Sequence, residues 1–237
     1  MSAAVKDESE AALAELAGRV RHDLKCLDYP AHHWVRPHKH SSGQHVYDAV
    51  IIGGGQCGLA VAFGLLRDKV NNILVVDENP AGFEGPWVTY ARMVTLRTPK
   101  YLTGPDLGVA SLTFRAFWEA QYGAAAWDEI GKIPREEWMR YLRWFRATLE
   151  IPVQNESKVT LIEPVERGLF RLQLAGGAES LLARKVVLAT GIQGGGEWHM
   201  PSFITSALPK HLYAHTSGPI DYSQYIGKKI GILGGGA

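Results

Sequence analysis

The stretch at residues 47–68, YDAVIIGGGQCGLAVAFGLLRD, decides the fold of this chain. Its first part is a short apolar run that predicts a buried strand, and its second part has apolar residues at helical spacing. Residues 71–80, NNILVVDENP, predict a second buried strand that ends in two acids, Asp77 and Glu78. Strand, helix and strand in this order make a βαβ unit, which implies a parallel sheet with covered faces.

A glycine-rich turn, GGGQCG at residues 53–58, lies between the predicted strand and the predicted helix and fits the pattern G-x-G-x-x-G. Gly53 permits the tight turn out of the strand, and Gly58 lets the helix pack close to the sheet. Gly55 has no Cβ, so a pyrophosphate can approach the backbone there. Free N–H groups at the helix start and the helix dipole then favour the phosphate charge.

Asp77, at the end of the second predicted strand, strengthens the assignment of a dinucleotide site. A carboxylate at this position can accept hydrogen bonds from a ribose. Because the turn follows a strand, precedes a helix and is followed by this acid, the sequence predicts dinucleotide binding. The alternative, a purely structural turn, leaves Asp77 unexplained.

Helices are predicted on both sides of the βαβ unit. Helical spacing of apolar residues indicates an amphipathic helix over residues 9–27, followed by a linker at 28–45 that is rich in histidine and proline. The aromatic-rich stretch 112–150 predicts further helices, the last around 135–149, in which most aromatic side chains serve packing. The linker histidines lack a cysteine or carboxylate at a familiar ligand spacing, so no metal site is assigned.

Strands are predicted again towards the end of the chain. Residues 158–187 have the pattern of β-structure, with a hairpin turn at Gly176-Gly177. The stretch KVVLATG at 185–191 predicts another buried strand. The predicted fold class is therefore α/β, a Rossmann-like dinucleotide-binding fold with a parallel sheet, a hairpin or meander insertion and a helical segment.

Composition excludes several classes of protein. The 237 residues are 46% hydrophobic and 21% charged, and the formal net charge is +1. No basic face stands out, which argues against nucleic acid as a partner, and no apolar run is long enough to span a bilayer. The two cysteines form no CxxC pair, and residues 1–10 are not a secretion signal, so we expect a reduced, cytoplasmic protein.

The segment that follows the second strand, GFEGPWVTYARMVTLRTPK at residues 82–100, resembles the class B flavoprotein monooxygenases. That family holds the Baeyer–Villiger, flavin-containing and N-hydroxylating monooxygenases. Its G-x-W segment lies along the flavin, and Gly85, Pro86 and Trp87 hold the matching positions here. The stretch VVLATG at 186–191 resembles the passage from the flavin domain towards the nicotinamide domain.

Further positions carry the resemblance in part. Val159 resembles the position whose backbone meets the adenine of FAD. His215-Thr216 resemble only the core of the fingerprint that precedes the nicotinamide turn, because His211 and Pro219 replace its glycine and its aromatic residue. This departure argues against the Baeyer–Villiger subtype.

The resemblance implies an enzyme that uses FAD and NADPH. In the family, NADPH reduces the flavin, which then reacts with molecular oxygen to give a hydroperoxide that oxygenates a soft nucleophile such as an amine or a sulfide. The reactive centre belongs to the cofactor, so no catalytic triad is expected and the catalytic residues stay unassigned. Besides oxygen, the expected partner is a small-molecule substrate.

The chain closes with IGILGGGA, in which Gly234 and Gly236 would be the first two glycines of a second G-x-G-x-x-G, the NADPH turn of the family. We therefore expect the N-terminal portion of a longer enzyme. The expected domains are an N-terminal helix and linker at 1–46, an FAD-binding domain at 47–220 with a helical insertion at about 105–150, and the start of a truncated NAD(P)-binding domain at 221–237. An unfinished strand at 230–234 would leave a sheet edge open to self-association.

Two alternatives remain open beside the monooxygenase. One is a flavin-dependent pyridine nucleotide reductase without a redox disulfide, and the other is a non-catalytic dinucleotide-binding fragment. Cys57 lies in the phosphate turn at a helix start, and a small side chain tolerated beside the cofactor is the plainer account of this cysteine. The predicted cofactor-binding residues are Gly53, Gly55, Gln56, Cys57, Gly58, Asp77, Glu78, Gly85, Pro86, Trp87, Val159, Ala189, Thr190, Gly191, Gly234 and Gly236.

Overall fold

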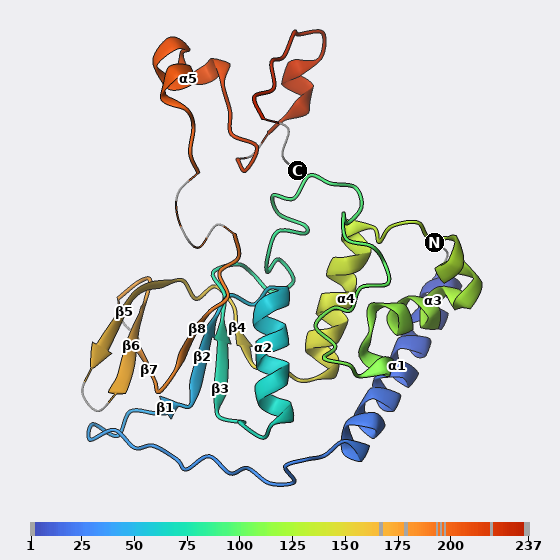
Figure 1. Ribbon diagram of the computed structural model, residues 1–237, viewed down its shortest axis with the longest axis vertical. Coiled ribbons are helices and arrows are strands. Elements are labelled where there is room, and N and C mark those ends of the chain that lie inside the picture. Colours follow the sequence, from blue (N-terminus) through green and yellow to red (C-terminus); the bar gives the residue numbers. More distant parts are fainter. Residues whose placement is uncertain are drawn as a thin grey trace. The chain divides into compact units, whose positions relative to one another are not determined.

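The predicted βαβ unit lies in the first of two compact units of the computed structural model, which comprise residues 1–195 and 196–237 (Figure 1). It consists of strand β2 (Ala49–Ile52), helix α2 (Gln56–Arg67) and strand β3 (Ile73–Val76). The described residues are 3–165, 168–177, 180–192, 194, 196, 198–218 and 220–234, with side chains described from residue 7 onward.

A parallel sheet is built around this unit, as predicted. Its strand order is β4-β3-β2-β8, where β4 is Val153–Gln154 and β8 is Val186–Leu188. Ile51 of β2 lies beside Val75 of β3 on one side and beside Val187 of β8 on the other. Since all four strands run in the same direction, the turns that follow β2, β3 and β8 meet at one edge of the sheet.

A second sheet contains the predicted hairpin. Its strand order is β1-β7-β6-β5, and the strands are β1 (Val46–Tyr47), β5 (Val159–Val165), β6 (Leu169–Leu174) and β7 (Ser180–Ala183). The strands β5, β6 and β7 are antiparallel neighbours, and Gly176 and Gly177 have φ of +92° and +75° in the turn between β6 and β7. Such positive φ values are unstrained only for glycine, which explains the predicted turn.

The apolar run that begins at Tyr47 enters both sheets. Tyr47 pairs with Ala183 of β7, whereas Ala49 pairs with Ile73 of β3. Between them, the buried carboxylate of Asp48 accepts a 2.9 Å hydrogen bond from Arg184. The predicted single strand is therefore two short strands that separate at Asp48.

The helices predicted in the aromatic-rich stretch 112–150 are confirmed. Helix α3 (Phe114–Glu129) follows a short 3₁₀ turn, η1 (Ala110–Leu112), and helix α4 (Arg135–Thr148) follows α3. The hydroxyl of Thr113 caps α3 by accepting a 3.1 Å hydrogen bond from the amide of Ala116.

Aromatic side chains of α3 and α4 pack together in the main core. Phe114 and Phe117 lie with their ring centroids 5.5 and 5.6 Å from that of Tyr141, and all three side chains are buried. The Tyr141 hydroxyl donates a 2.8 Å hydrogen bond to the carbonyl of Leu112. Burial raises the pKa of Tyr141 well above its ordinary value, and the charge of Asp106 adds to the shift. These aromatic residues serve packing, as the sequence predicted.

Helix α1 (Ala3–Cys26) completes the helical layer (Figure 1). Val20 is fully buried in the main core, and Leu13, Leu16 and Leu24 pack against it. The indole of Trp144 in α4 donates a 3.4 Å hydrogen bond to the carbonyl of Leu13. The amphipathic helix predicted over residues 9–27 is thus confirmed, and it begins earlier.

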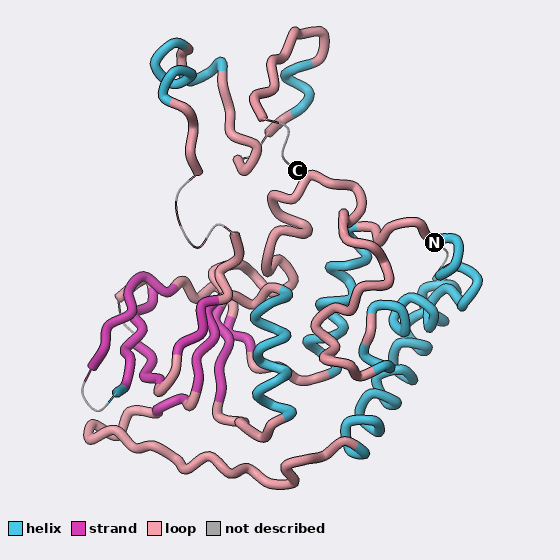
Figure 2. The backbone as a smooth tube through the Cα atoms, viewed as in Figure 1, coloured by secondary structure: helices cyan, strands magenta, loops and turns pink. Residues whose placement is uncertain are grey.

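The histidine-rich linker is a loop that runs along the amino ends of the parallel strands (Figure 2). It is held by single hydrogen bonds, among them one of 2.8 Å from the Trp34 indole to the carbonyl of Asp68 and one from Gln44 to the carbonyl of Ser180. Among the described residues, no three histidine, cysteine or acidic side chains gather in a way that could hold a metal ion.

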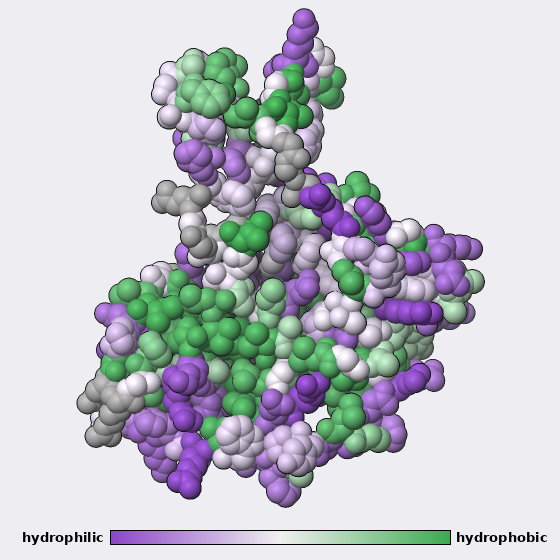
Figure 3. Space-filling model, in the orientation of Figure 1, coloured by the Kyte–Doolittle hydropathy of each residue, from purple (hydrophilic) through white to green (hydrophobic). Residues whose placement is uncertain are grey.

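The surface of the first unit is partly apolar. On the face drawn in Figure 3, apolar side chains gather over the strands. Leu161 of β5 and Leu188 of β8 are exposed. In the part of the chain that the structure describes, no helix is both long and apolar enough to cross a membrane.

The second unit has little regular structure. It contains the short helix α5 (Ser202–Ala207) and the 3₁₀ turns η3 (Lys210–Leu212) and η4 (Tyr222–Tyr225). The strand predicted over residues 230–234 is wrong, because these residues are exposed and adopt no strand. A strand is stable only beside a hydrogen-bonded neighbour, and no described residue pairs with this segment. The expected open sheet edge therefore has no basis in the described structure.

Candidate cofactor site

The glycine turn between β2 and α2 has the geometry that its sequence requires. Gly53 has φ +108°, and a Cβ on it would come within 2.4 Å of the carbonyl oxygen of Ala189, just after β8. A Cβ on Gly58 would come within 1.8 Å of the carbonyl oxygen of Gly53. Both positions therefore need glycine for the turn itself and for the close approach of α2.

Gly55 differs from these two glycines because its neighbour is another loop. A Cβ on Gly55 would lie 3.5 Å from the Cα of Gly85, which is an ordinary contact distance. Gly85 has φ +74° and is the first residue of the segment Gly85-Pro86-Trp87, called the G-P-W segment below. Two backbone stretches without side chains thus face each other beside the start of α2.

The start of α2 fits an anionic group. Gly55 is its N-cap, and no side chain caps the N–H groups of its first turn. Gln56 is the first helical residue, and Cys57 beside it is an exposed free thiol. Uncapped N–H groups at a helix start bind phosphate well, so the cradle of Gly55, Gly85 and the helix start fits the pyrophosphate of a dinucleotide.

Asp77 is buried at the end of β3 and is held by its own loop. Its Oδ2 accepts a 2.7 Å hydrogen bond from the amide of Gly54, and its Oδ1 accepts bonds of 2.8 and 2.9 Å from the backbone and side chain of Asn79. A carboxylate offers about four acceptor positions, so one remains for a ribose hydroxyl. The neighbouring Glu78 is exposed and pairs with Lys158 at 2.9 Å.

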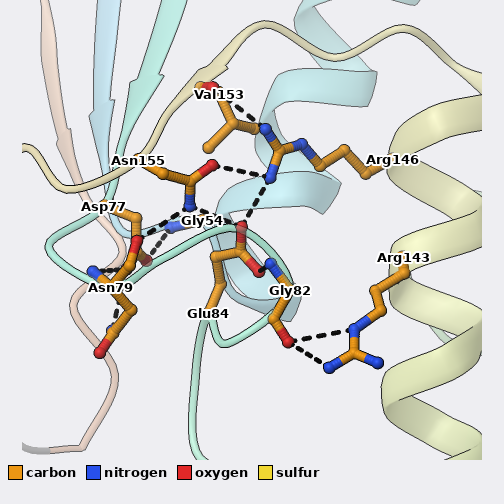
Figure 4. A network of polar contacts seen from close by, with 9 residues as sticks. All are labelled: Gly54, Asp77, Asn79, Gly82, Glu84, Arg143, Arg146, Val153 and Asn155. Carbon is orange, nitrogen blue, oxygen red and sulfur yellow. Dashed lines mark hydrogen bonds and ion pairs between the residues drawn. The ribbon is translucent and has the colours of Figure 1, made fainter.

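Behind this loop lies a polar network that the sequence did not predict (Figure 4). Its centre is Glu84, a buried carboxylate that pairs with Arg146 of α4 at 2.6 Å. Glu84 also accepts hydrogen bonds from the side chain of Asn155 and from the amide of Gly82. In the sequence, the acid Glu84 beside Gly85 was the available sign of this network, but the partners of Glu84 lie far along the chain.

Two tryptophans connect the G-P-W segment with α2 and α4. The rings of Trp87 and Trp138 meet edge to face with centroids 6.3 Å apart. The Trp138 indole donates a 3.2 Å hydrogen bond to the side-chain oxygen of Gln56. The indole nitrogen of Trp87 is buried and has no hydrogen-bond partner among the described residues, which leaves a donor for a ligand. Pro86 lies between Gly85 and Trp87, and its carbonyl accepts a hydrogen bond from the amide of Ala91 in a turn.

The residues after β8 lie at the same edge of the parallel sheet. The amide of Ala189 donates a 2.8 Å hydrogen bond to the carbonyl of Ile52, at the end of β2. Thr190 and Gly191 follow as exposed residues, and Gly191 has φ +71°. Val159 lies instead in the second sheet, where it opens β5 beside Leu174.

The predicted nicotinamide turn lies in the second unit. Gly234 is exposed and has φ +103°, whereas Gly236 lies outside the described residues. His215 contacts the hydroxyl of Ser217 at 2.7 Å and the ring of Trp198 with centroids 4.9 Å apart. Both contacts lie within the second unit.

A family model described as FAD-NAD(P)-binding matches residues 50–193, which include the glycine turn, Asp77 and the G-P-W segment. The chain belongs to this FAD-NAD(P)-binding family. Membership agrees with the predicted resemblance to flavoproteins and with the predicted FAD-binding fold.

Two curated proteins show the range of relatives. The FAD-dependent urate hydroxylase of Xanthomonas campestris pv. campestris is 61% identical over 226 residues, which are 95% of this chain and 47% of that protein. An uncharacterized CzcO-like oxidoreductase of Geobacillus kaustophilus is 26% identical over 194 residues, which are 81% of this chain and 49% of that protein. The chain thus spans about half the length of the curated relatives it matches.

A solved structure supports the fold. The ornithine hydroxylase of Pseudomonas aeruginosa superposes with a TM-score of 0.51 at 18% identity, over 60% of this chain and 38% of that one. At this level of identity the match concerns the fold only. It agrees with the predicted Rossmann-like architecture of the first unit.

Proposed function

We propose that the protein is an FAD-dependent hydroxylase that acts on urate or a closely related purine. The observation that carries this proposal is the 61% identity over 226 residues with a urate hydroxylase, which extends through nearly the whole chain. The residues that form the cradle beside α2 then bind FAD.

Each part of the site has a proposed role in holding FAD. The start of α2, with Gln56 and Cys57, and the facing glycines Gly55 and Gly85 receive the pyrophosphate, where the helix dipole favours negative charge. Asp77 accepts a ribose hydroxyl with its remaining acceptor position.

Three further positions complete the proposed site. The backbone of Val159 meets the adenine, Trp87 lies along the flavin, and Ala189–Gly191 border the passage between the flavin and nicotinamide parts. The proposal for Trp87 is supported by its buried indole N–H, which has no partner among the described residues. Burial of an unpaired donor is unfavourable, so a ligand acceptor would stabilise this arrangement.

The electrons are proposed to come from NADPH, whose turn would begin at Gly234. When bound and reduced, FAD supplies two electrons to molecular oxygen, so that one oxygen atom enters the substrate and the other leaves as water. The residues of this chain bind and orient the cofactor and keep water from the reacting atoms. A cytoplasmic location belongs to the same proposal, because both cysteines are free thiols.

Urate is preferred here over the amine or sulfide that the family resemblance implies. The reason is that the relative with 61% identity is a urate hydroxylase. The expectation of an amine or a sulfide substrate rests instead on general features of the monooxygenase family. Urate, amines and sulfides all contain an electron-rich atom that can accept oxygen. The substrate classes are therefore tested side by side.

The first experiment is an FAD-binding measurement. The purified protein is mixed with FAD, separated from excess by gel filtration and examined by visible absorption. Flavin bands in near-stoichiometric amount are expected, and a colourless protein would contradict the proposed cofactor.

Activity is then measured with urate, an amine and a sulfide under ¹⁸O₂, with NADPH or NADH as the reductant. We expect urate to be consumed and one ¹⁸O atom to appear in the product. Reduction of FAD without incorporation of oxygen would favour a reductase. No reduction at all would favour a binding module.

A further inference from the structure

Both carboxylate oxygens of Glu84 accept hydrogen bonds, although this side chain lies in the interior. Glu84 is only 4% exposed, and its Oε1 accepts 2.6 and 2.7 Å hydrogen bonds from Arg146 and Asn155. Its Oε2 accepts a 2.8 Å bond from the amide of Gly82. A buried carboxylate is tolerated only when its oxygens are paired in this way, so removal of one partner leaves an unfavourable charge.

The network joins several elements that are distant in sequence. Besides Glu84, Arg146 at the end of α4 donates 3.0 and 3.1 Å hydrogen bonds to the side chain of Asn155 and to the carbonyl of Val153 in β4. Asn155 in turn donates a 3.0 Å bond to the carbonyl of Asn79, two residues after Asp77 (Figure 4). Helix α4, the end of β4 and the loop after β3 are thereby fixed to one carboxylate.

This carboxylate lies directly behind the proposed pyrophosphate cradle. A Cβ on Gly54 would come within 3.1 Å of the Cγ of Glu84. Glu84 is also the residue before Gly85, whose Cα faces Gly55. A shift of Glu84 therefore changes the separation of the two glycine backbones without any contact between Glu84 and a ligand.

We infer that Glu84 is a positioning residue for FAD: its pairing with Arg146 and Asn155 holds Gly85 at the distance from Gly55 that the pyrophosphate requires. This inference rests on the proposed function, because it concerns the affinity for FAD. It adds an ion pair between α4 and the loop after β3 to the determinants of that affinity.

A general effect on stability is the competing explanation, and the chain offers a matched control. Asp48 and Arg184 form a similar ion pair at 2.9 Å, with side chains that are 5% and 39% exposed, compared with 5% for Glu84 and 25% for Arg146. Asp48 lies at the amino end of β2, whereas the cradle lies at its carboxyl end. Loss of this control pair affects stability without moving Gly85.

The test compares Glu84→Gln with Asp48→Asn in the purified 237-residue chain. FAD affinity is measured by titration of flavin fluorescence at a temperature where circular dichroism shows each variant to be folded. We expect both variants to unfold at lower temperature than the wild type. Glu84→Gln should raise the Kd for FAD at least about tenfold, since the amide places an N–H group against a donor, whereas Asp48→Asn should stay within about twofold.

Arg146→Lys keeps the positive charge but cannot reach Glu84, Asn155 and Val153 together. We expect it to weaken FAD binding less than Glu84→Gln does. If Glu84→Gln fails to fold, Arg146→Lys decides the question, and an unchanged Kd in this variant would overturn the inference.

The outcomes separate the inference from the proposed function. A wild-type protein that binds no FAD overturns both. A wild-type protein that binds FAD, together with folded variants of Glu84 and Asp48 that have the same Kd as each other, overturns only the positioning role. A loss of affinity in Glu84→Gln alone supports it.

Discussion

The backbone amide of Gly54 donates a 2.7 Å hydrogen bond to Oδ2 of Asp77, so that the turn after β2 is tied to the end of β3. Asp77 thus contributes to the shape of the glycine turn as well as offering an acceptor to a ribose. The two contributions predict that a change at Asp77 affects both FAD affinity and stability.

Replacement of Asp77 by asparagine keeps the size of the side chain but turns one acceptor oxygen into a donor. Either Gly54 or Asn79 then loses its partner, and we expect the Kd for FAD to rise about tenfold and the unfolding temperature to fall by several degrees. Flavin fluorescence and thermal unfolding measure the two effects. Asp128→Asn is the control, since Asp128 is exposed and is not among the predicted cofactor-binding residues, and an effect as large in this variant would argue against a specific role of Asp77.

The glycines of the turn should respond differently to alanine. Gly58→Ala places a Cβ 1.8 Å from the carbonyl oxygen of Gly53, so we expect loss of several kcal/mol of stability or failure to fold. Gly55 has φ −71°, which alanine adopts without strain, and its Cβ would meet only an ordinary contact. Gly55→Ala should therefore stay folded and bind FAD at least about tenfold more weakly.

Chemical denaturation with circular dichroism and FAD titration distinguish these two variants. Equal stability of both would contradict the packing role of Gly58. Normal FAD affinity of Gly55→Ala would show that the pyrophosphate does not approach this backbone.

Helix α1 should unfold together with α3 and α4. Val20 is fully buried in the core cluster that also holds side chains of α3 and α4, and Val20→Ala is expected to lower the free energy of unfolding by about 2 kcal/mol. Leu27→Ala is the control because Leu27 is 56% exposed. Urea unfolding followed by circular dichroism gives both values, and equal stability of Val20→Ala and wild type would show that α1 is not part of the main core.

Because Tyr141 is buried, we expect the free energy of unfolding to depend on pH in the alkaline range. Burial raises the pKa of Tyr141, so the folded protein keeps a phenolic proton that the unfolded chain releases near pH 10. The stabilisation by the neutral tyrosine is therefore complete below about pH 10 and is lost as the pH rises through the folded-state pKa.

Tyr141→Phe tests this dependence. The variant leaves the carbonyl of Leu112 without a partner, which should cost about 1–2 kcal/mol at neutral pH. Because phenylalanine does not titrate, the difference between variant and wild type should shrink above about pH 10. Urea unfolding at neutral and alkaline pH measures it, and a constant difference would contradict the assignment.

The central part of the fold could be predicted because its signals are local. The glycine turn, the two apolar runs and Asp77 lie within one βαβ unit, and their periodicity specifies both the elements and the parallel pairing. The hairpin at Gly176-Gly177 was equally clear, since the positive φ values require glycine.

Other features depend on contacts between distant residues and left no local pattern. The first apolar run separates at Asp48, whose ion-pair partner Arg184 is distant in sequence. The two-residue strand β4 is defined by its pairing with β3, and Glu84 gains its partners from α4 and from the end of β4. The error over residues 230–234 has the same origin, because apolar character alone does not supply a neighbouring strand.

The position of β8 has a consequence for how the protein folds during synthesis. Strand β2 pairs with β3 soon after both are made, but its other edge waits for Val186–Leu188, and the nearby bond between Arg184 and Asp48 spans 136 residues. A nascent chain must therefore keep one side of β2 unpaired while the helical segment is translated. We expect the β2–β8 pairing to be the slow, late step of folding, and pulse-labelled hydrogen exchange would detect it as delayed protection of the amides of Val50 and Ala189.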